Sequence, residues 1–92
     1  MIKIIKLVTG EDVIADVSVS NNEALLKNAF RFVMTAEGLA SIPLMPFSKD
    51  KEYVISMNHI IFMANPEEEF LNSYNAQHGS GIVIAKNTLI SE

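Results

Sequence analysis

The residues from Asp12 to Ser20 alternate between apolar and polar side chains. A period of two residues is typical of a β-strand with one buried face. Only Ile14 interrupts the polar side of the pattern. The apolar side consists of Val13, Ala15, Val17 and Val19. The segment is therefore predicted to be a half-buried strand.

A second apolar segment, Met1 to Val8, precedes this strand and contains isoleucine and valine, which favour strands. Thr9-Gly10-Glu11 lies between the two segments, and Gly10 can adopt the positive φ that tight turns require. We therefore expect the two segments to form a β-hairpin.

A third strand is predicted from Ala24 to Met34, after Asn21 and Asn22, which tolerate left-handed conformations. Asn28 interrupts its apolar side, which indicates a bend or bulge. Helical spacing of some apolar residues is the competing reading, but the aromatic and β-branched continuation favours a strand. The apolar residues expected on one side are Ala24, Leu26, Phe30, Phe32 and Met34.

The next segments are shorter. Residues 41–50 contain Pro43 and Pro46, so they form at best an edge strand. Residues 52–56 and 59–64 follow as a fourth and a fifth strand, or as one hairpin.

A helix is predicted over residues 66–78, with Asn65 as its cap and Pro66 at its first position. Gly79 ends it, and the apolar residues after Gly81 could add an outer strand or dock on a neighbour. The chain is thus expected to be one domain over residues 1–92, with a barrel at 1–64, the helix at 66–78 and an extended tail at 82–92.

Composition limits the partners and the location. The chain is 49% hydrophobic, which is high for 92 residues, so we expect part of its apolar surface to meet another copy or another protein. Its net charge is −4, so any nucleic-acid binding must be local. It contains no cysteine, and the sequence shows no signal peptide and no apolar run of membrane-spanning length, so a cytoplasmic protein is expected.

Catalytic patterns are missing from the sequence. There is no nucleophile motif, phosphate loop or metal-ligand spacing, so we expect neither an enzyme nor a cofactor nor a bound metal. Glu67, Glu68 and Glu69 are better explained by the positive end of a helix dipole. For His59, a strand-end residue hydrogen-bonded to backbone is favoured over a ligand contact.

Two segments resemble the motifs of the Sm-like family (LSm and bacterial Hfq). Residues 4–17 with 25–29 look like its first motif, and residues 53–62 look like its second. Among the family's binding residues, the histidine of the Hfq form has its counterpart in His59, whereas the Asp, Asn and Arg-Gly of the Sm form do not recur. The Leu-Val-Thr-Gly-Glu stretch at residues 7–11 and the Asn65-Pro66 helix start also resemble uncharacterised proteins of marine cyanophages, which implies the cytoplasm of a host cell.

The resemblance implies a small, strongly bent, antiparallel five-stranded barrel, a homo-oligomeric ring, and binding of single-stranded RNA or DNA. A small barrel of the SH3 or OB kind is the alternative fold. Nucleic acid is expected at loops whose amide and imidazole groups can contact unpaired bases, with Lys27 or Arg31 for phosphates. The loop residues are Asn21, Asn22, Ser56, Met57, Asn58 and His59.

A structural or protein-interaction ring that does not bind nucleic acid remains the second hypothesis. The net charge favours it, whereas the family resemblance favours RNA.

Overall fold

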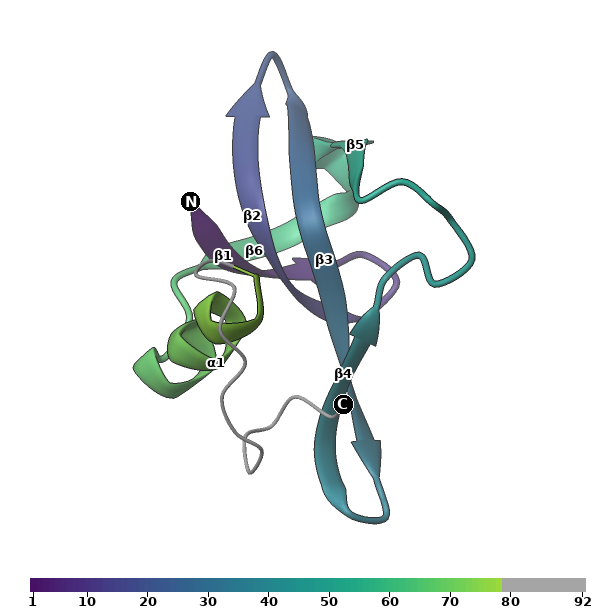
Figure 1. The fold of residues 1–92 in the computed structure, drawn as a ribbon. Coiled ribbons are helices and arrows are strands. Elements are labelled where there is room, and N and C mark those ends of the chain that lie inside the picture. The colour runs from purple at the N-terminus through teal and green to yellow at the C-terminus, as the bar shows by residue number, and fades with distance from the viewer. Residues whose placement is uncertain (79–92) are drawn as a thin grey trace.

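The computed structural model describes residues 1–78, which form a bent sheet followed by one helix (Figure 1). In chain order the elements are β1 (Ile2–Leu7), β2 (Asp12–Ser20), β3 (Glu23–Thr35), β4 (Gly38–Pro43), β5 (Glu52–Ser56), the 3-10 turn η1 (Met57–His59), β6 (Ile60–Ala64) and α1 (Glu68–His78). Every strand pairing is antiparallel, and the sheet order is β4-β3-β2-β1-β6 with β5 added to β3. The predicted mostly antiparallel β fold with one helix after the strands is confirmed.

The sheet has six strands rather than the expected five, and over residues 1–78 no pairing joins β5 to β6 to close it. The additional strand is β4, which pairs with β3 and lies at one end of the sheet order. It begins at Gly38, earlier than the edge segment predicted at 41–50, and it ends at Pro43. A proline fits there because it has no N–H to donate to a further strand.

Both predicted turns are present. Gly10 has φ +105°, and the Leu7 N–H donates to the Glu11 carbonyl at 3.0 Å across the β1–β2 turn. Asn21 and Asn22 have φ of 50° and 67°, the positive pair that joins tightly twisted strands. Local backbone preference therefore places both hairpins.

Asn28 forms the predicted bulge in β3. Its φ is +51°, and between the pairs Asp16–Lys27 and Ile14–Phe30 two residues of β3 stand opposite one of β2. The extra residue reverses which side of the sheet the following residues face. Leu26 packs in the main core, whereas Phe32, of the same parity, packs on the helix. The expectation that Ala24, Leu26, Phe30, Phe32 and Met34 share one side is wrong for this reason.

The bulge also lets β3 serve two neighbours on one edge. Residues 23–27 pair with β5, and residues 30–35 pair with β4. The Asn28 N–H donates to the Lys51 carbonyl at 2.9 Å, just before β5 begins. The bend in β3 thus directs β4 and β5 to different parts of the fold.

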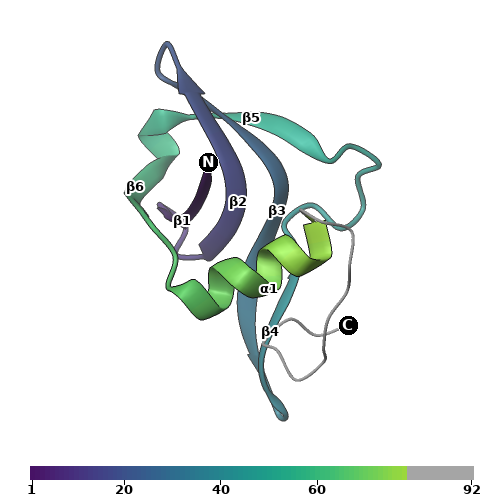
Figure 2. The ribbon, with the colours of Figure 1, turned by 60° about the vertical axis from the view of Figure 1, so that its left-hand side comes forward.

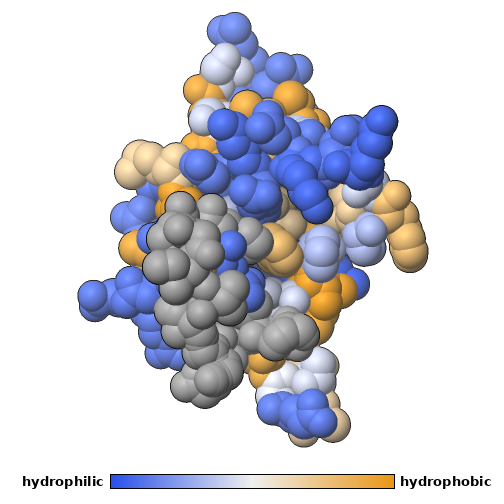
Figure 3. Space-filling view, viewed as in Figure 1, coloured by the Kyte–Doolittle hydropathy of each residue, from blue (hydrophilic) through white to orange (hydrophobic). Residues whose placement is uncertain are grey.

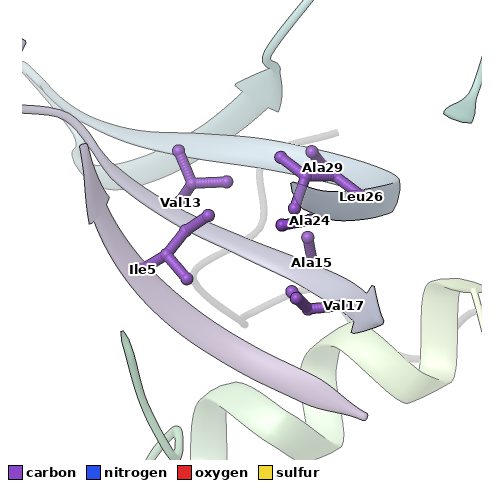
Figure 4. Close-up of a cluster of buried hydrophobic side chains, with 7 residues drawn as sticks. All are labelled: Ile5, Val13, Ala15, Val17, Ala24, Leu26 and Ala29. Atoms are coloured by element: carbon purple, nitrogen blue, oxygen red, sulfur yellow. The ribbon is translucent and has the colours of Figure 1, made fainter. Parts of the chain in front are cut away.

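The main core lies on the inner side of the bent sheet (Figure 4). Side chains from β1, β2 and β3 point toward one another there, and residues of β5, η1 and β6 pack against them. The buried members are Ile5, Val13, Ala15, Val17, Ala24, Leu26 and Ala29. The alternation seen in β2 is therefore the alternation between this core and the opposite face.

The helix begins at Glu68, two residues later than predicted. Its first backbone bond runs from the Leu71 N–H to the Glu67 carbonyl at 3.0 Å. The Asn65 side chain instead accepts a hydrogen bond from Lys3 Nζ at 2.7 Å. The Asn65 side chain is therefore hydrogen-bonded to Lys3 of β1, and Pro66 lies before the first residue of the helix. The predicted tail at 82–92 lies outside the described residues.

Helix α1 covers the outer side of the sheet, lying across β3 (Figure 2). The rings of Phe32 and Phe70 meet edge to face, with centroids 5.8 Å apart. Ile14, the exception in the pattern of β2, is buried because this second face is covered as well. A sheet with two covered faces explains why one strand departs from strict alternation.

Tyr74 joins the helix to the bulge. Its side chain is buried, and its hydroxyl donates to the carbonyls of Asn28 at 2.8 Å and Lys27 at 3.1 Å. We expect Tyr74→Phe to lower the free energy of unfolding by about 1–3 kcal/mol, because it removes the donor from partly buried carbonyls. Urea denaturation of the two proteins at neutral pH measures this difference.

The same hydroxyl makes stability depend on alkaline pH. Burial, with the nearby negative charge of Asp16, raises the pKa of Tyr74 to about 12. An unfolded tyrosine loses its proton near pH 10, so the folded state holds the proton over the range between about 10 and 12. Stability is complete below about pH 10 and falls as the pH rises toward 12. Tyr74→Phe should remove this part of the pH dependence, and an unchanged slope would contradict the assignment.

Candidate nucleic-acid interface

The β2–β3 turn and the 3-10 turn η1 lie together at one end of the sheet. The Met57 N–H donates to the Asn22 carbonyl at 3.0 Å, and Ser56 stands opposite Glu23 in the pairing of β5 with β3. These two loops are more than thirty positions apart in the sequence. The pairing of β3 with β5 therefore brings the two predicted loop groups into one place.

The conformation of η1 follows from a local cap. The Ser56 hydroxyl accepts a hydrogen bond from the Asn58 N–H at 3.1 Å, as a serine before a helical turn commonly does. The turn has no fully buried residue, and the Asn58 and His59 side chains are exposed. Amide and imidazole groups are thus presented to solvent from a fixed backbone.

His59 borders a hollow of about 310 Å³, here called the His59 hollow. Its other lining residues are Leu7, Val8 and Thr9 of the β1–β2 segment and Ile55 of β5. The His59 carbonyl accepts from the Val8 N–H at 2.9 Å, which ties η1 to the β1–β2 turn. Val8 and Thr9 were not predicted as site residues, because only the pairing of distant segments reveals that they lie beside His59.

Thr9, which lines the His59 hollow, is hydrogen-bonded to Glu11. The Thr9 hydroxyl donates to the Glu11 carboxylate, and this bond lowers the pKa of Glu11. The positive charge of Arg31 also lowers the pKa of Glu11, by a smaller amount. The carboxylate therefore stays ionised at neutral pH, and it adds negative charge near the β1–β2 turn.

Lys27 and Arg31 do not lie at the junction of the two loops. Lys27 stands opposite Asp16 on one side and Glu52 on the other, so carboxylates flank it across the sheet. Arg31 lies beyond the bulge, opposite Val13 and Ile42. The structure thus brings six of the eight predicted residues to one end and leaves the two cations along β3.

The cations of β1 are engaged elsewhere. Lys6 forms an ion pair with Asp12 at 2.8 Å, and Lys3 contacts Asn65. The amino group of Met1 pairs with Asp16 at 2.8 Å. Exposed pairs of this kind contribute little stability, but they lower the net positive charge that these groups offer to a phosphate.

Neither a group of potential metal ligands nor a membrane-spanning helix is found in residues 1–78. No three or more His, Asp or Glu side chains gather there as metal ligands would. In the same range, the single helix falls short of the length and apolar character needed to cross a membrane.

Comparisons with family models and with curated proteins add no relative to this description. No protein-family model matches the chain. No curated protein matches it either.

Proposed function

We propose that this chain forms a homo-oligomeric ring of the Sm-like type and binds single-stranded RNA where the β2–β3 turn meets η1. The observation that carries the proposal is the backbone contact between Met57 and Asn22, which unites the two loops. These are the loops whose amide and imidazole groups suit unpaired bases. The proposed role is binding without catalysis.

The arrangement of strands supports the likeness to an Sm-like barrel. A long third strand bends at Asn28, and β5 and β6 are joined by only one 3-10 turn while pairing with β3 and β1. In the proposal, these two strands bring the ends of the bent sheet toward each other around the core. In the proposed barrel, β5 and β6 pack on the shared core without pairing with each other, so their outer edges stay available to neighbouring copies.

The ring accounts for two strand edges. Within residues 1–78, β5 pairs with β3 alone and β6 with β1 alone, so each has one unpaired edge. Val54, Ile61 and Phe62 are exposed on these strands, and residues 56–65 contain no proline and no Lys, Arg, Asp or Glu. Such an edge favours association. Pairing β5 of one copy with β6 of the next covers both edges.

The electrostatics set a condition on RNA binding. Each chain carries a net charge of −4, and a ring multiplies it. Lys27 has no ion pair in the described part of the chain, so it and Arg31 can contact phosphates along β3. Because the favourable charge is confined to a few groups, binding should weaken steeply as salt rises.

A protein-interaction ring is the second candidate. It is favoured by the net negative charge and by a fully exposed aromatic residue, Phe47, in the β4–β5 loop. Exposed apolar side chains are common at protein contacts. The two candidates differ in whether RNA binds at low salt.

Fluorescence anisotropy with a mixed pool of short single-stranded RNAs tests the proposal. We expect binding at about 50 mM salt and release as salt increases. His59→Ala should weaken binding roughly tenfold or more if the imidazole stacks on a base, and Asn58→Ala should weaken it as well. The matched controls are Lys49→Ala and Lys51→Ala in the β4–β5 loop.

The outcomes separate the candidates. Absence of binding at low salt would leave the protein-interaction ring as the better explanation. Equal losses in the η1 variants and in the β4–β5 loop variants would keep RNA binding but reject this site.

A further inference from the structure

An apolar hollow of about 380 Å³, here called the α1 hollow, opens on the outer side of the sheet at the start of the helix. Its apolar lining is Ile4, Phe32, Leu39, Ala64, Pro66 and Phe70. Asp12, Asn65 and Glu67 supply its polar lining. A hollow of this composition suits one large apolar side chain.

Phe47 is an apolar side chain with no cover in the described structure. It lies in the loop between β4 and β5 and is 100% exposed, and its neighbour Met45 is half exposed. Figure 3 shows apolar surface along the side where Figure 1 places this loop. In both Figure 1 and Figure 2 the loop and the start of α1 are on opposite sides of the molecule. Phe47 is fully exposed and does not line the α1 hollow of its own copy.

The ring proposed above would bring these two features together between copies. All pairings in the sheet are antiparallel. If β5 of one copy pairs with β6 of the next in the same manner, the beginning of β5 at Glu52 lies beside the end of β6 at Ala64. Ala64 and Pro66 line the α1 hollow, and Phe47 is only five residues before Glu52, within reach of about 17 Å of extended chain.

The charges on the two surfaces are complementary. Lys49 and Lys51 follow Phe47, with Asp50 between them. Glu67 lines the α1 hollow, Glu68 and Glu69 come next in the chain, and all three are exposed. The nearby Lys3 and Lys6 are engaged with Asn65 and Asp12. Opposite charges around an apolar contact favour one orientation of the two copies.

We propose that Phe47 of one copy docks in the α1 hollow of the next copy around the ring. This inference rests on the proposed ring, and it adds a side-chain contact to the backbone pairing of β5 with β6. It also assigns a use to the β4–β5 loop, which the RNA site does not involve.

A single tryptophan can report this contact, because the chain contains none. In Phe47→Trp, the indole should be solvated in the monomer and buried in the ring. We expect its emission to shift to shorter wavelength as the protein concentration rises and the ring assembles. Emission that stays typical of solvated tryptophan in an assembled ring would overturn the docking and leave the ring itself intact.

The energetic test uses Phe47→Ala and mass measurement by light scattering over a range of concentrations. Loss of the phenyl group should raise the protein concentration at which the oligomeric ring dissociates by about tenfold or more. Val19→Ala, at an exposed apolar residue near the β2–β3 turn, is the matched control and should have little effect. If the wild type and Phe47→Ala dissociated at the same protein concentration, the docking would be overturned. That result would favour another occupant of the α1 hollow. A wild-type chain that stays monomeric at every concentration would overturn both the ring and the docking.

Discussion

Replacement of Leu26 by alanine is expected to lower the free energy of unfolding by about 2–5 kcal/mol. Leu26 is completely buried, in the core shared by β1, β2 and β3. The substitution loses the transfer free energy of the side chain and leaves a cavity that the surrounding strands can fill only in part. A domain of this size has roughly 5–14 kcal/mol of total stability, so the loss is a large share of it.

Leu25→Ala is the matched control for this substitution. Leu25 is the adjacent residue of the same strand, and it is only partly buried. Leu25→Ala should therefore lower the free energy of unfolding much less than Leu26→Ala does. Urea denaturation at one fixed protein concentration measures both variants, because association would make stability depend on concentration. Equal losses would contradict the inner core as described.

In the proposed ring, replacement of Val54 by proline is expected to release a folded monomer of 10.2 kDa. The Met57 N–H donates to the Asn22 carbonyl, and the Lys51 carbonyl accepts from the Asn28 N–H. The odd-numbered residues from 51 to 57 therefore direct their backbone groups toward β3. Backbone groups alternate in direction along an antiparallel strand, so the N–H of Val54 points to the unpaired edge. Proline removes this one donor and places its ring where the next copy would pair.

Ile55→Pro is the informative comparison. Ile55 pairs with Ala24, and its backbone groups face β3. Proline at this position therefore breaks the pairing of β5 with β3 within one copy. We expect this variant to lose its fold, as judged by circular dichroism, whereas Val54→Pro keeps it. Light scattering supplies the masses. An unchanged oligomer in Val54→Pro would show that the β5 edge takes no part in assembly.

The turns of this protein could be predicted from the sequence because they depend on the residues within them. Gly10, Asn21, Asn22 and Asn28 are residues that tolerate positive φ, and each has it in the structure. The preference belongs to the single residue and its neighbours, so no distant contact is needed to recognise it. The strands between these turns follow from the same local patterns.

The helix shows where local signals become insufficient. Asn65 and Pro66 resemble a helix start, yet the helix begins at Glu68. The Asn65 side chain is engaged by Lys3, which is 62 positions away in the sequence. A contact at that separation exists only after β1 and β6 have paired.

The candidate site divides in the same way. The sequence by itself determined its turns, its exposed polar residues and the period of its strands, because these are set by side chains close together in the chain. The tertiary structure alone decided that Asn22 would meet Met57, that Val8 would meet His59, and that Lys27 and Arg31 would lie apart from them. The physical reason is that strand register and the extra residue at Asn28 fix which distant residues become neighbours, and both result from packing the whole sheet around one core.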